Sequence, residues 1–201
     1  MSNTYVYPYK NALYINLTNR CSNDCDFCLR RTSNGVGEYN LWLDGEPDAA
    51  AVLAAVDGYG LRQVSEVVFC GFGEPTMALP VLLDAARGIR ARRPDLPIRI
   101  NTNGQANLIH GRDVTGELAG LVDIVSVSLN APTAEEYDAL CHPEHGPAAF
   151  DAVLDFCRKC AARGIRVTMS VIDTLGEEKI AACRKIAGDA GATLRVRPYI
   201  G

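Results

Sequence analysis

The sequence contains no apolar run long enough to cross a membrane. A spanning helix needs about 20 consecutive apolar residues, and none of the 201 residues falls in such a run. The first eight residues lack the charged segment and apolar core of a secretory signal peptide. No linker, repeat or low-complexity stretch divides the chain, so we expect a single domain over 1–201. These absences predict a soluble cytoplasmic protein.

The chain also lacks an excess of positive charge. Its 20 Lys and Arg residues are outnumbered by 24 Asp and Glu residues, which gives a formal net charge of −4 at pH 7. This balance argues against a general nucleic-acid-binding role, although it leaves room for a local basic groove. Hydrophobic residues make up 48% of the chain, which is enough to build a substantial core.

Cysteine, by contrast, is plentiful. Eight cysteines in a chain of intracellular character indicate metal binding or redox chemistry rather than a disulfide framework. Cys21, Cys25 and Cys28 form a C-x3-C-x2-C pattern of soft ligands, which suits iron–sulfur clusters and zinc. A four-iron cluster usually takes four cysteines, so three would leave one iron open for a small ligand. Zinc with a fourth ligand from elsewhere and idle cysteines are the alternatives, and the spacing favours the cluster.

Strand-like and helix-like segments alternate along the chain. Strands are predicted over 13–18, 64–70, 98–100, 124–129, 167–171 and 193–196. Helices are predicted over 48–56, 79–93, 114–121, from a capping box at 133, across 150–161 and over 177–190, and the segment 29–47 is expected to be irregular. This alternation predicts an α/β fold with a parallel sheet. Six units are too few for a closed barrel, so we expect an open (β/α)6 partial TIM barrel; a flat doubly wound sheet has the same pattern.

The polar and glycine-rich segments each follow a predicted strand. The cysteine triplet follows the first strand, 71–76 follows the second, 101–104 the third, and 128–130 closes the fourth. Because the carboxyl ends of parallel strands meet along one edge of a sheet, these four segments are expected to converge on one cleft. Taken alone, each of the last three is also an ordinary turn sequence. Their common position therefore favours a functional site more than any one of them does.

Together these segments resemble the radical S-adenosylmethionine (SAM) superfamily. The C-x3-C-x2-C pattern with Phe27 before its last cysteine is similar to that superfamily's cluster motif, and 71–75 resembles its methionine-binding turn. The wording of 16–21, 69–76 and 101–113 looks most similar to the small radical SAM proteins associated with TatD-type hydrolases. The resemblance covers nearly the whole chain.

The resemblance implies an enzyme that uses a [4Fe–4S] cluster and SAM. One electron from the reduced cluster would cleave SAM into methionine and a 5′-deoxyadenosyl radical, which abstracts hydrogen from a substrate. The implied cluster ligands are Cys21, Cys25 and Cys28. The residues implied to contact SAM are Phe27, Gly71, Phe72, Gly73, Glu74, Pro75, Asn101, Thr102, Asn103, Ser128 and Asn130. The implied partners are a single-electron donor such as flavodoxin or ferredoxin and a TatD-type hydrolase of the same pathway.

Elementary chemistry agrees with these implied roles. Glycines in the 71–75 turn let the backbone approach a ligand closely, and 101–103 offers short polar side chains for a ribose. Ser128 and Asn130 are two residues apart, so within a strand both would point at the nucleoside from one face. Phe27 would either cover the adenine or simply pack against the protein.

Candidates for substrate contacts stand apart from the cofactor motifs. They are His142, Asp173, Arg195 and Arg197. Arg195 and Arg197 share one face of the last predicted strand, where they would hold a carboxylate or phosphate if that face is the inner one; otherwise they mark the charged outer face of an edge strand. His142 lies in a Cys-His-Pro-Glu-His segment that is more typical of a loop than of a metal site. Asp173 meets the ribose or substrate, or forms an Asx turn.

Several other residues carry weaker signals. Looser candidates for anion contacts are Arg30, Arg31, His110 and Arg112. Cys157 and Cys160 form a C-x2-C pattern, but they lie on or near the apolar face of a predicted helix and no second pair follows, which favours buried small hydrophobes. The same interpretation applies to Cys70 and Cys183.

The sequence leaves the substrate open. A small molecule, a peptide or protein (as for a glycyl-radical activase) and RNA are alternatives, since 71–75 and 127–132 also resemble segments of radical SAM RNA methyltransferases. The chain lacks their methyl-carrying cysteine pair and a basic extension, which argues against methyl transfer and against nucleic acid. It also lacks a cysteine-rich C-terminal domain for auxiliary clusters. The alternative outside enzymes is a non-catalytic iron–sulfur or zinc module.

Overall fold

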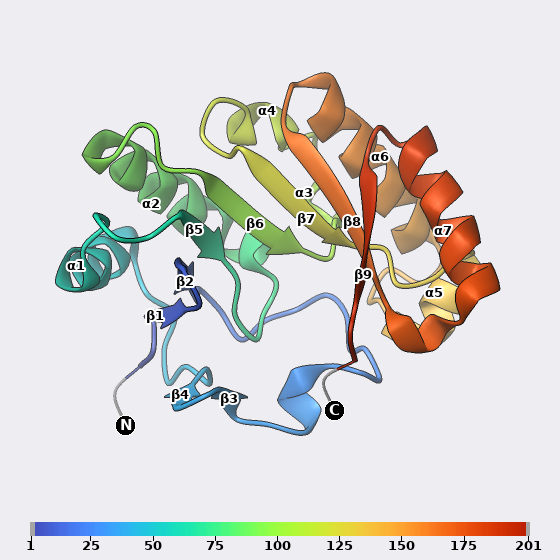
Figure 1. Ribbon diagram of the computed structural model, residues 1–201, viewed down its shortest axis with the longest axis horizontal. Coiled ribbons are helices and arrows are strands. Elements are labelled where there is room, and N and C mark those ends of the chain that lie inside the picture. The colour runs from blue at the N-terminus through green and yellow to red at the C-terminus, as the bar shows by residue number, and fades with distance from the viewer. Residues whose placement is uncertain (1–2, 200–201) are drawn as a thin grey trace.

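Seven strands form one sheet in the order β1-β2-β5-β6-β7-β8-β9 in the computed structural model, which describes residues 3–199 (Figure 1). The sheet strands are β1 (Val6–Tyr9), β2 (Ala12–Ile15), β5 (Glu66–Phe69), β6 (Ile98–Thr102), β7 (Ile124–Ser128), β8 (Arg166–Ile172) and β9 (Thr193–Arg197). The α-helices are α1 (Ala49–Tyr59), α2 (Leu79–Arg92), α3 (Ala106–His110), α4 (Thr115–Leu118), α5 (Ala134–Cys141), α6 (Ala148–Ala162) and α7 (Glu177–Asp189). Among the helices of residues 3–199, none is both long and apolar enough to cross a membrane.

The six predicted strands are confirmed as the parallel part of the sheet. β2 and β5 to β9 run parallel in chain order, and β1 is added antiparallel to β2 at the edge. Since every crossover proceeds in the same direction and has the same hand, Figure 1 shows the helices along one side of the curved sheet. The chain has an α/β fold with an open, mostly parallel sheet of the partial TIM barrel type, and the flat doubly wound alternative is wrong.

Local corrections concern short elements. The segment expected to be irregular contains the 3-10 helix η1 (Leu29–Arg31) and the small hairpin of β3 (Gly35–Val36) and β4 (Tyr39–Asn40). β1 was not predicted, and neither was α3. The helix predicted over 114–121 is a single turn, α4. Within the described residues no helix follows β9, so the last of the six strand–helix units lacks its helix.

The two faces of the sheet differ in chemistry. In β6, Ile98 and Ile100 are fully buried against the helices, whereas Arg99 and Asn101 alternate with them on the opposite face and are half-buried. The same alternation in β7 and β8 places Ser126, Ser128, Thr168 and Ser170 on that opposite face. The inner face of the curved sheet is therefore lined by polar side chains, while the outer face builds the core.

Candidate active site

The three motif cysteines lie on an extended loop, residues 21–28, at the carboxyl end of β2. This cluster loop is clamped to the end of α5 by three backbone hydrogen bonds: Asp24 N to Cys141 O (3.0 Å), Asp26 N to Leu140 O (3.1 Å) and Glu144 N to Ser22 O (2.8 Å). Because the loop has no regular structure of its own, its shape depends on a helix more than 100 residues away in the chain.

Side chains that follow the loop hold it from the other side. Arg31 donates from Nε to the Cys25 carbonyl (3.0 Å) and from Nη2 to the Asp24 carbonyl (3.0 Å). Arg30 donates to the Asn23 carbonyl (3.2 Å) and to the Asp24 carboxylate (3.3 Å). These two arginines were looser candidates for anion contacts, but their donors are used to fix the loop.

Three further candidates also make internal contacts. His142 ends α5 with a left-handed backbone (φ 43°), and its exposed ring lies 2.9 Å from the Asp26 carboxylate. His110 Nε2 lies 2.8 Å from the Thr76 carbonyl, and Arg112 pairs with Glu117. His142 thus contacts the cluster loop at the surface, and its contact with a substrate stays a prediction.

The thiols of the loop are half-exposed but strongly influenced by their surroundings. Burial, together with the charge of Glu74, raises the pKa of Cys21 to about 12. A hydrogen bond between the thiols of Cys25 and Cys141, together with burial, raises the pKa of Cys25. Thiols with raised pKa values are protonated at neutral pH, so a metal must displace their protons to bind.

The cysteine arrangement does not suit a single metal ion. Within residues 3–199, no three His, Cys, Asp or Glu side chains come together closely enough to hold one ion. A structural zinc site needs four ligands at about 2.0–2.3 Å from one centre. A four-iron cluster instead bonds each cysteine to a different corner, so three thiols on one loop suit its ligand chemistry.

The glycine-rich turn, residues 71–76, packs directly against the segment that leads into the cluster loop. A Cβ on Gly73 would lie 2.3 Å from the Thr18 carbonyl oxygen, and one on Gly71 would lie 1.9 Å from Asn16 Oδ1. Glu74 N donates to the Arg20 carbonyl at 2.7 Å. Gly73 is thus required because another backbone segment approaches closely, and Gly71 because the side chain of Asn16 fills the space beside it.

Glu74 is a buried carboxylate that ties three segments together. It is 3% exposed. Its Oε1 accepts hydrogen bonds from Thr76 N (3.0 Å), Thr76 Oγ1 (2.7 Å) and Thr102 Oγ1 (2.8 Å), and its Oε2 accepts one from Asn103 N (2.6 Å). Burial raises its pKa, and these donors oppose that shift. Glu74 therefore fixes the glycine turn to the end of β6.

A buried polar network joins the cluster loop to the end of β6 and to α5. Asn103 Nδ2 donates to Ser22 Oγ (2.8 Å), and Gln105 Nε2 donates to Asn23 Oδ1 (2.6 Å). The Tyr137 hydroxyl accepts from both Asn23 and Gln105, at 3.0 and 3.1 Å. Ser22, Asn23, Gln105 and Tyr137 were missed by the sequence analysis, because no local pattern indicates which distant polar side chains will pair.

The side chains of residues 101–103, which were predicted to bind a ribose, hydrogen-bond to other residues of the protein. Asn101 accepts from Arg99 (2.9 Å), Thr102 bonds to Glu74, and Asn103 bonds to Ser22 and to the backbone of Gln105. These bonds arise because Thr102 and Asn103 are buried at a strand end, where polar groups need partners. Contact of these residues with a ribose stays a prediction.

Asn130 departs from the predicted geometry and offers a free acceptor. The strand β7 ends at Ser128, and Asn130 has a left-handed backbone (φ 61°), so the two side chains do not share a strand face as expected. Asn130 is 1% exposed, and its Nδ2 donates to the Cys141 sulfur at 3.4 Å. Its Oδ1 has no hydrogen-bond partner in the structure. An unpaired buried acceptor beside the cluster loop fits a ligand that brings a donor.

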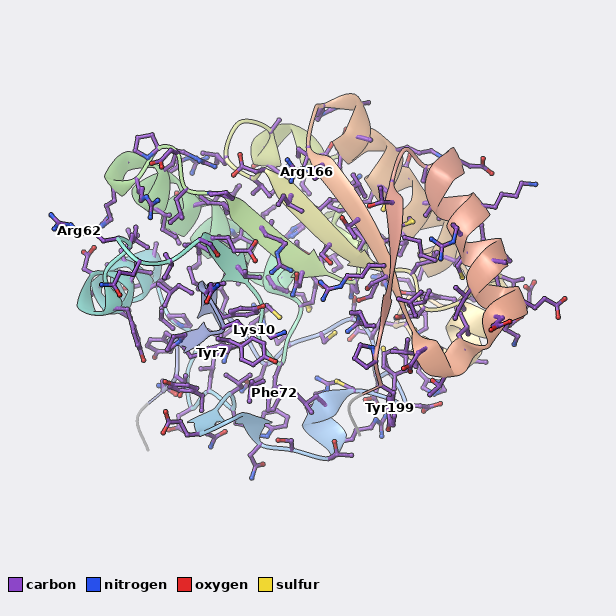
Figure 2. All side chains as sticks on the ribbon, in the orientation of Figure 1. Tyr7, Lys10, Arg62, Phe72, Arg166 and Tyr199 are labelled. Atoms are coloured by element: carbon purple, nitrogen blue, oxygen red, sulfur yellow. The ribbon has the colours of Figure 1, made fainter. Side chains whose placement is uncertain are left out.

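The two aromatic candidates pack within the protein. Phe72 is buried in a small cluster with Tyr7 and Leu41, and its ring meets Trp42 edge to face at 4.9 Å between centroids. Phe27 is half-buried against the main core. Figure 2 shows Phe72 on the same side of the molecule as Tyr199, near the carboxyl ends of the strands.

The remaining cysteines divide into two groups. Cys157, Cys160 and Cys183 are buried in the apolar core, as predicted. The prediction for Cys70 is wrong: it is half-exposed on the inner face, where it hydrogen-bonds to Asn101, because it follows β5 at a position that points away from the helices. Cys141, which the sequence analysis placed in a loop segment, is the last residue of α5.

The substrate candidates of the last strand lie on the inner face. Arg197 donates from Nε to Ser170 Oγ at 3.2 Å, and Arg195 is the register partner of Ser170. The alternative, in which the two arginines lie on the outer face of the edge strand, is wrong. Asp173 accepts from Tyr199 N at 3.0 Å, which ties down the chain after β9. Their contact with a substrate stays a prediction.

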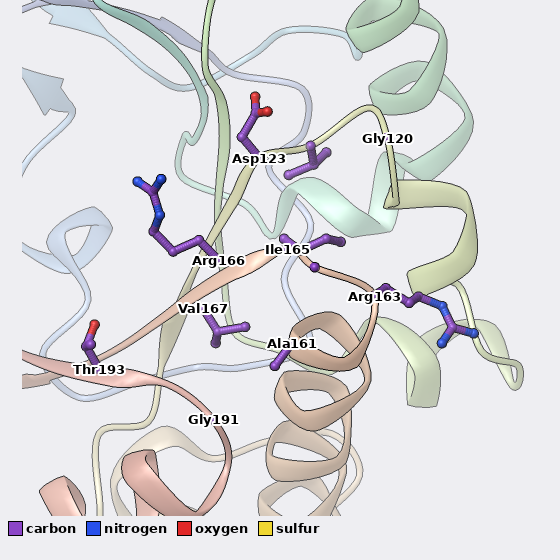
Figure 3. Close-up of a pocket in the computed structure, with 11 residues that line it drawn as sticks. Gly120, Asp123, Ala161, Arg163, Ile165, Arg166, Val167, Gly191 and Thr193 are labelled. Atoms are coloured by element: carbon purple, nitrogen blue, oxygen red, sulfur yellow. The ribbon is translucent and has the colours of Figure 1, made fainter.

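A hollow of about 610 Å³ lies at the opposite end of the sheet, at the amino ends of β7, β8 and β9. Figure 3 shows its two arginines, Arg163 and Arg166, extending away from one another. Asp123 is already bonded to Arg90 (2.7 Å) and to Ile98 N (2.7 Å). No group in this hollow converges on a common point, so it is not the candidate active site.

The fold and the cluster loop define the class: a partial α/β barrel that presents three thiols at the carboxyl edge of its sheet. The chain matches the radical SAM superfamily over residues 15–189, a segment that includes the cysteine triplet, the glycine turn and the inner-face strands up to β8. The match covers most of the chain. The chain therefore belongs to the radical SAM superfamily, and membership implies a [4Fe–4S] cluster and SAM.

Solved structures of this class superpose well at low sequence identity. A radical SAM methyltransferase from Sphaerobacter thermophilus gives a TM-score of 0.67 at 17% identity, over 96% of this chain and 58% of that one. SuiB of Streptococcus suis bound to SAM gives 0.68 at 17% identity, over 96% and 40%. The methyltransferase TsrM from Kitasatospora setae, with cobalamin and a [4Fe–4S] cluster bound, gives 0.60 at 15% identity, over 92% and 36%. At these identities the likeness shows the fold alone.

Part of the chain is also similar to curated proteins of a different kind. A phosphatidyl-myo-inositol mannosyltransferase of Mycobacterium tuberculosis, and the same enzyme of Mycobacterium bovis, are 32% identical to this chain over 130 residues. That stretch covers 63% of this chain and 33% of each relative, so the chain spans about a third of their length. A likeness of this extent does not define a family.

Proposed function

We propose that this protein cleaves SAM reductively and uses the product radical to abstract hydrogen from a substrate. One observation carries the proposal: three half-exposed thiols on a single clamped loop lie beside a glycine turn and an unpaired buried acceptor, Asn130 Oδ1. When bound, the cluster and SAM supply one electron and a 5′-deoxyadenosyl group. The chain's own residues ligate, orient and shield these groups.

The proposed division of labour follows the contacts. Cys21, Cys25 and Cys28 hold the cluster, and the amides of the network around Asn23 and Gln105 keep the loop in shape. Backbone groups of the glycine turn and the free Oδ1 of Asn130 receive the polar groups of SAM. Ser128 lies on the inner face two residues before Asn130, where a nucleoside hydroxyl would find a partner.

The proposal also covers the subgroup of the superfamily, the partner proteins and the side of the sheet that binds the substrate. Placement among the TatD-associated radical SAM proteins is supported by the sequence wording of 16–21, 69–76 and 101–113. A single-electron donor such as flavodoxin or ferredoxin supplies the electron, and a TatD-type hydrolase acts in the same pathway. The inner face is the substrate side, because it is polar and adjoins the cluster loop.

Anaerobic reconstitution tests the proposal directly. The purified protein is loaded with iron and sulfide and incubated with SAM and dithionite, and 5′-deoxyadenosine and methionine are measured by mass spectrometry. Equal amounts of both are expected from the wild type and none from the Cys21→Ala, Cys25→Ala and Cys28→Ala variants. A cluster-loaded wild type without 5′-deoxyadenosine would contradict the proposal, and bound zinc without sulfide would favour the non-catalytic module.

A further inference from the structure

Arg197 differs from the other arginines of this protein in its environment. Most arginines pair with a carboxylate, as Arg90 does with Asp123 and Arg99 with Glu66. In the part of the chain that the structure describes, the arginines without such a partner are Arg62, Arg158, Arg166, Arg184, Arg195 and Arg197. The first five are exposed, where water solvates the charge, but Arg197 is half-buried. A partly buried cation without a counter-ion is costly.

The position of Arg197 connects it to the candidate active site. Its Nε donates to the hydroxyl of Ser170, which is 3% exposed. The carbonyl of Ser170 in turn accepts hydrogen bonds from Leu129 N (2.9 Å) and from Asn130 N (3.2 Å). Ser170 therefore connects the Arg197 side chain to the backbone of Asn130, the residue that has the unpaired acceptor.

Arg195 adds a second positive charge to the same face. It is two residues before Arg197 in β9, with Ser170 as its register partner, and its side chain makes no hydrogen bond or ion pair with the residues that the structure describes. Burial and the charge of Arg195 lower the pKa of Arg197. Two like charges that face the same space repel each other, and an anion between them would relieve both the repulsion and the burial cost.

Arg99 provides the internal contrast. It lies on the same inner face, on β6, but Glu66 accepts from it through both carboxylate oxygens, at 2.7 and 3.0 Å. Its donors are used and its charge is balanced. At the carboxyl end of the inner face, Arg195 and Arg197 thus keep guanidinium donors without a carboxylate partner, whereas the charge of Arg99 is neutralised by Glu66.

We propose that Arg197 and Arg195 form the binding site for a carboxylate or phosphate group of the substrate. The proposal rests on the proposed function, which makes the inner face the substrate side. A guanidinium presents paired donors that match an oxyanion bidentately. Arg195 and Arg197 are two residues apart on one strand, and two guanidiniums so placed can hold one oxyanion between them. The group recognised is therefore a single small oxyanion.

Titration of the cluster-loaded protein with inorganic phosphate and with acetate tests the site. Binding is measured by calorimetry in the presence and absence of SAM, and compared among wild type, Arg197→Gln, Arg195→Gln and Arg166→Gln. Arg166 is the matched control, because it is also an unpaired arginine on the inner face but lies at the amino end of β8 (Figure 2). At least one of the two anions is expected to bind the wild type with SAM present. Its affinity should fall at least tenfold in Arg197→Gln, several-fold in Arg195→Gln and not at all in Arg166→Gln.

Two further readouts guard against a folding defect or a different ligand. Iron content and melting temperature report whether Arg197→Gln is folded, and Arg197→Lys, which keeps the charge but loses the paired donors, should lose affinity only in part. No anion binding to the wild type, or an equal loss in Arg166→Gln, would overturn the inference. So would competition between phosphate and SAM together with weakened SAM binding in Arg197→Gln, because the arginine would then serve the carboxylate of SAM.

The same samples separate this inference from the proposed function. If the wild type forms 5′-deoxyadenosine but binds neither anion, the anion site is wrong and the proposed function stands. If it binds an anion through Arg197 but forms no 5′-deoxyadenosine, the anion site stands and the proposed chemistry is wrong.

Discussion

The two ends of the sheet differ in how they treat polar groups. At the carboxyl end, Glu74, Asn103 and Asn130 are buried, and all but one of their side-chain oxygens and nitrogens are hydrogen-bonded. At the amino end, a hollow of about 610 Å³ is lined by Asp123, Arg163 and Arg166, which are exposed (Figure 3). Burying polar groups is costly unless they are paired. The carboxyl end has these buried and paired polar groups. Their presence, rather than the size of a hollow, identifies it as the functional end.

The strongest contrast concerns cysteine. We expect Cys25→Ala at the carboxyl end to reduce bound iron to background after anaerobic reconstitution. The cluster is bound by three cysteines of one loop, and the two that remain are too few to hold it. Cys160→Ala, at the amino end of the same fold, is the control and should keep its iron. Iron and sulfide assays together with the visible absorbance measure the effect. Retention of iron by Cys25→Ala would break the comparison.

Glycine provides the next test. Gly73→Ala would press a methyl group to within 2.3 Å of the Thr18 carbonyl oxygen. Overpacking of this kind should lower the free energy of unfolding by about 1–3 kcal/mol, and it should displace the segment that leads to Cys21. Gly188→Ala, in a helix with no atom within 4 Å of the added Cβ, should raise stability by up to about 1 kcal/mol. Urea denaturation of the unloaded protein measures both, and equal effects would contradict the expectation.

Replacement of one carboxylate oxygen at each end should lower stability by amounts that again differ between the two ends. Glu74→Gln replaces an acceptor with a donor inside a set of buried donors, which should cost about 1–3 kcal/mol. Asp123→Asn makes the matching change at the amino end, where the carboxylate is half-exposed and paired with Arg90. Its expected cost is about 1 kcal/mol or less. The melting temperatures of the two variants decide the order.

The smallest effect is expected at the surface of the cluster loop. His142→Ala removes an exposed contact with Asp26, so it should cost no more than about 1 kcal/mol and leave iron content unchanged. Asp26→Asn is the reciprocal control. A large loss of iron in His142→Ala would mean that the His142–Asp26 contact holds the loop in place, contrary to the comparison.

The predictable parts of this structure are those with local signals. The β-branched residues of Val67–Phe69 and Ile124–Ser128 predict these two strands. The capping box at Thr133 predicts the start of α5, where Thr133 Oγ1 accepts a hydrogen bond from Glu136 N at 3.2 Å. The four-residue strand β1 carries a proline and offers no such signal. Helix α4 is too short for its periodicity to be reliable.

The candidate site shows the same division. Its cysteine triplet and glycine turn are visible as spacing, and their position after strands predicts that they meet. The partners that hold them, such as Cys141 for Cys25 or Tyr137 for Asn23, lie more than 100 residues away in the sequence. Which polar side chains pair across such a distance depends on the packing of helices, and a single sequence does not encode that in any local pattern.

The sequence by itself determined the alternating α/β architecture, the soft-ligand triplet and the common edge of the motifs, because each depends on neighbouring residues and on the fixed direction of parallel crossovers. Only the tertiary structure decided that Arg195 and Arg197 face inward, that Gly73 makes room for another backbone segment, and that Asn130 keeps a free acceptor. Those outcomes depend on which face of a strand the helices cover and on which distant atoms arrive there, and chain order alone does not specify either.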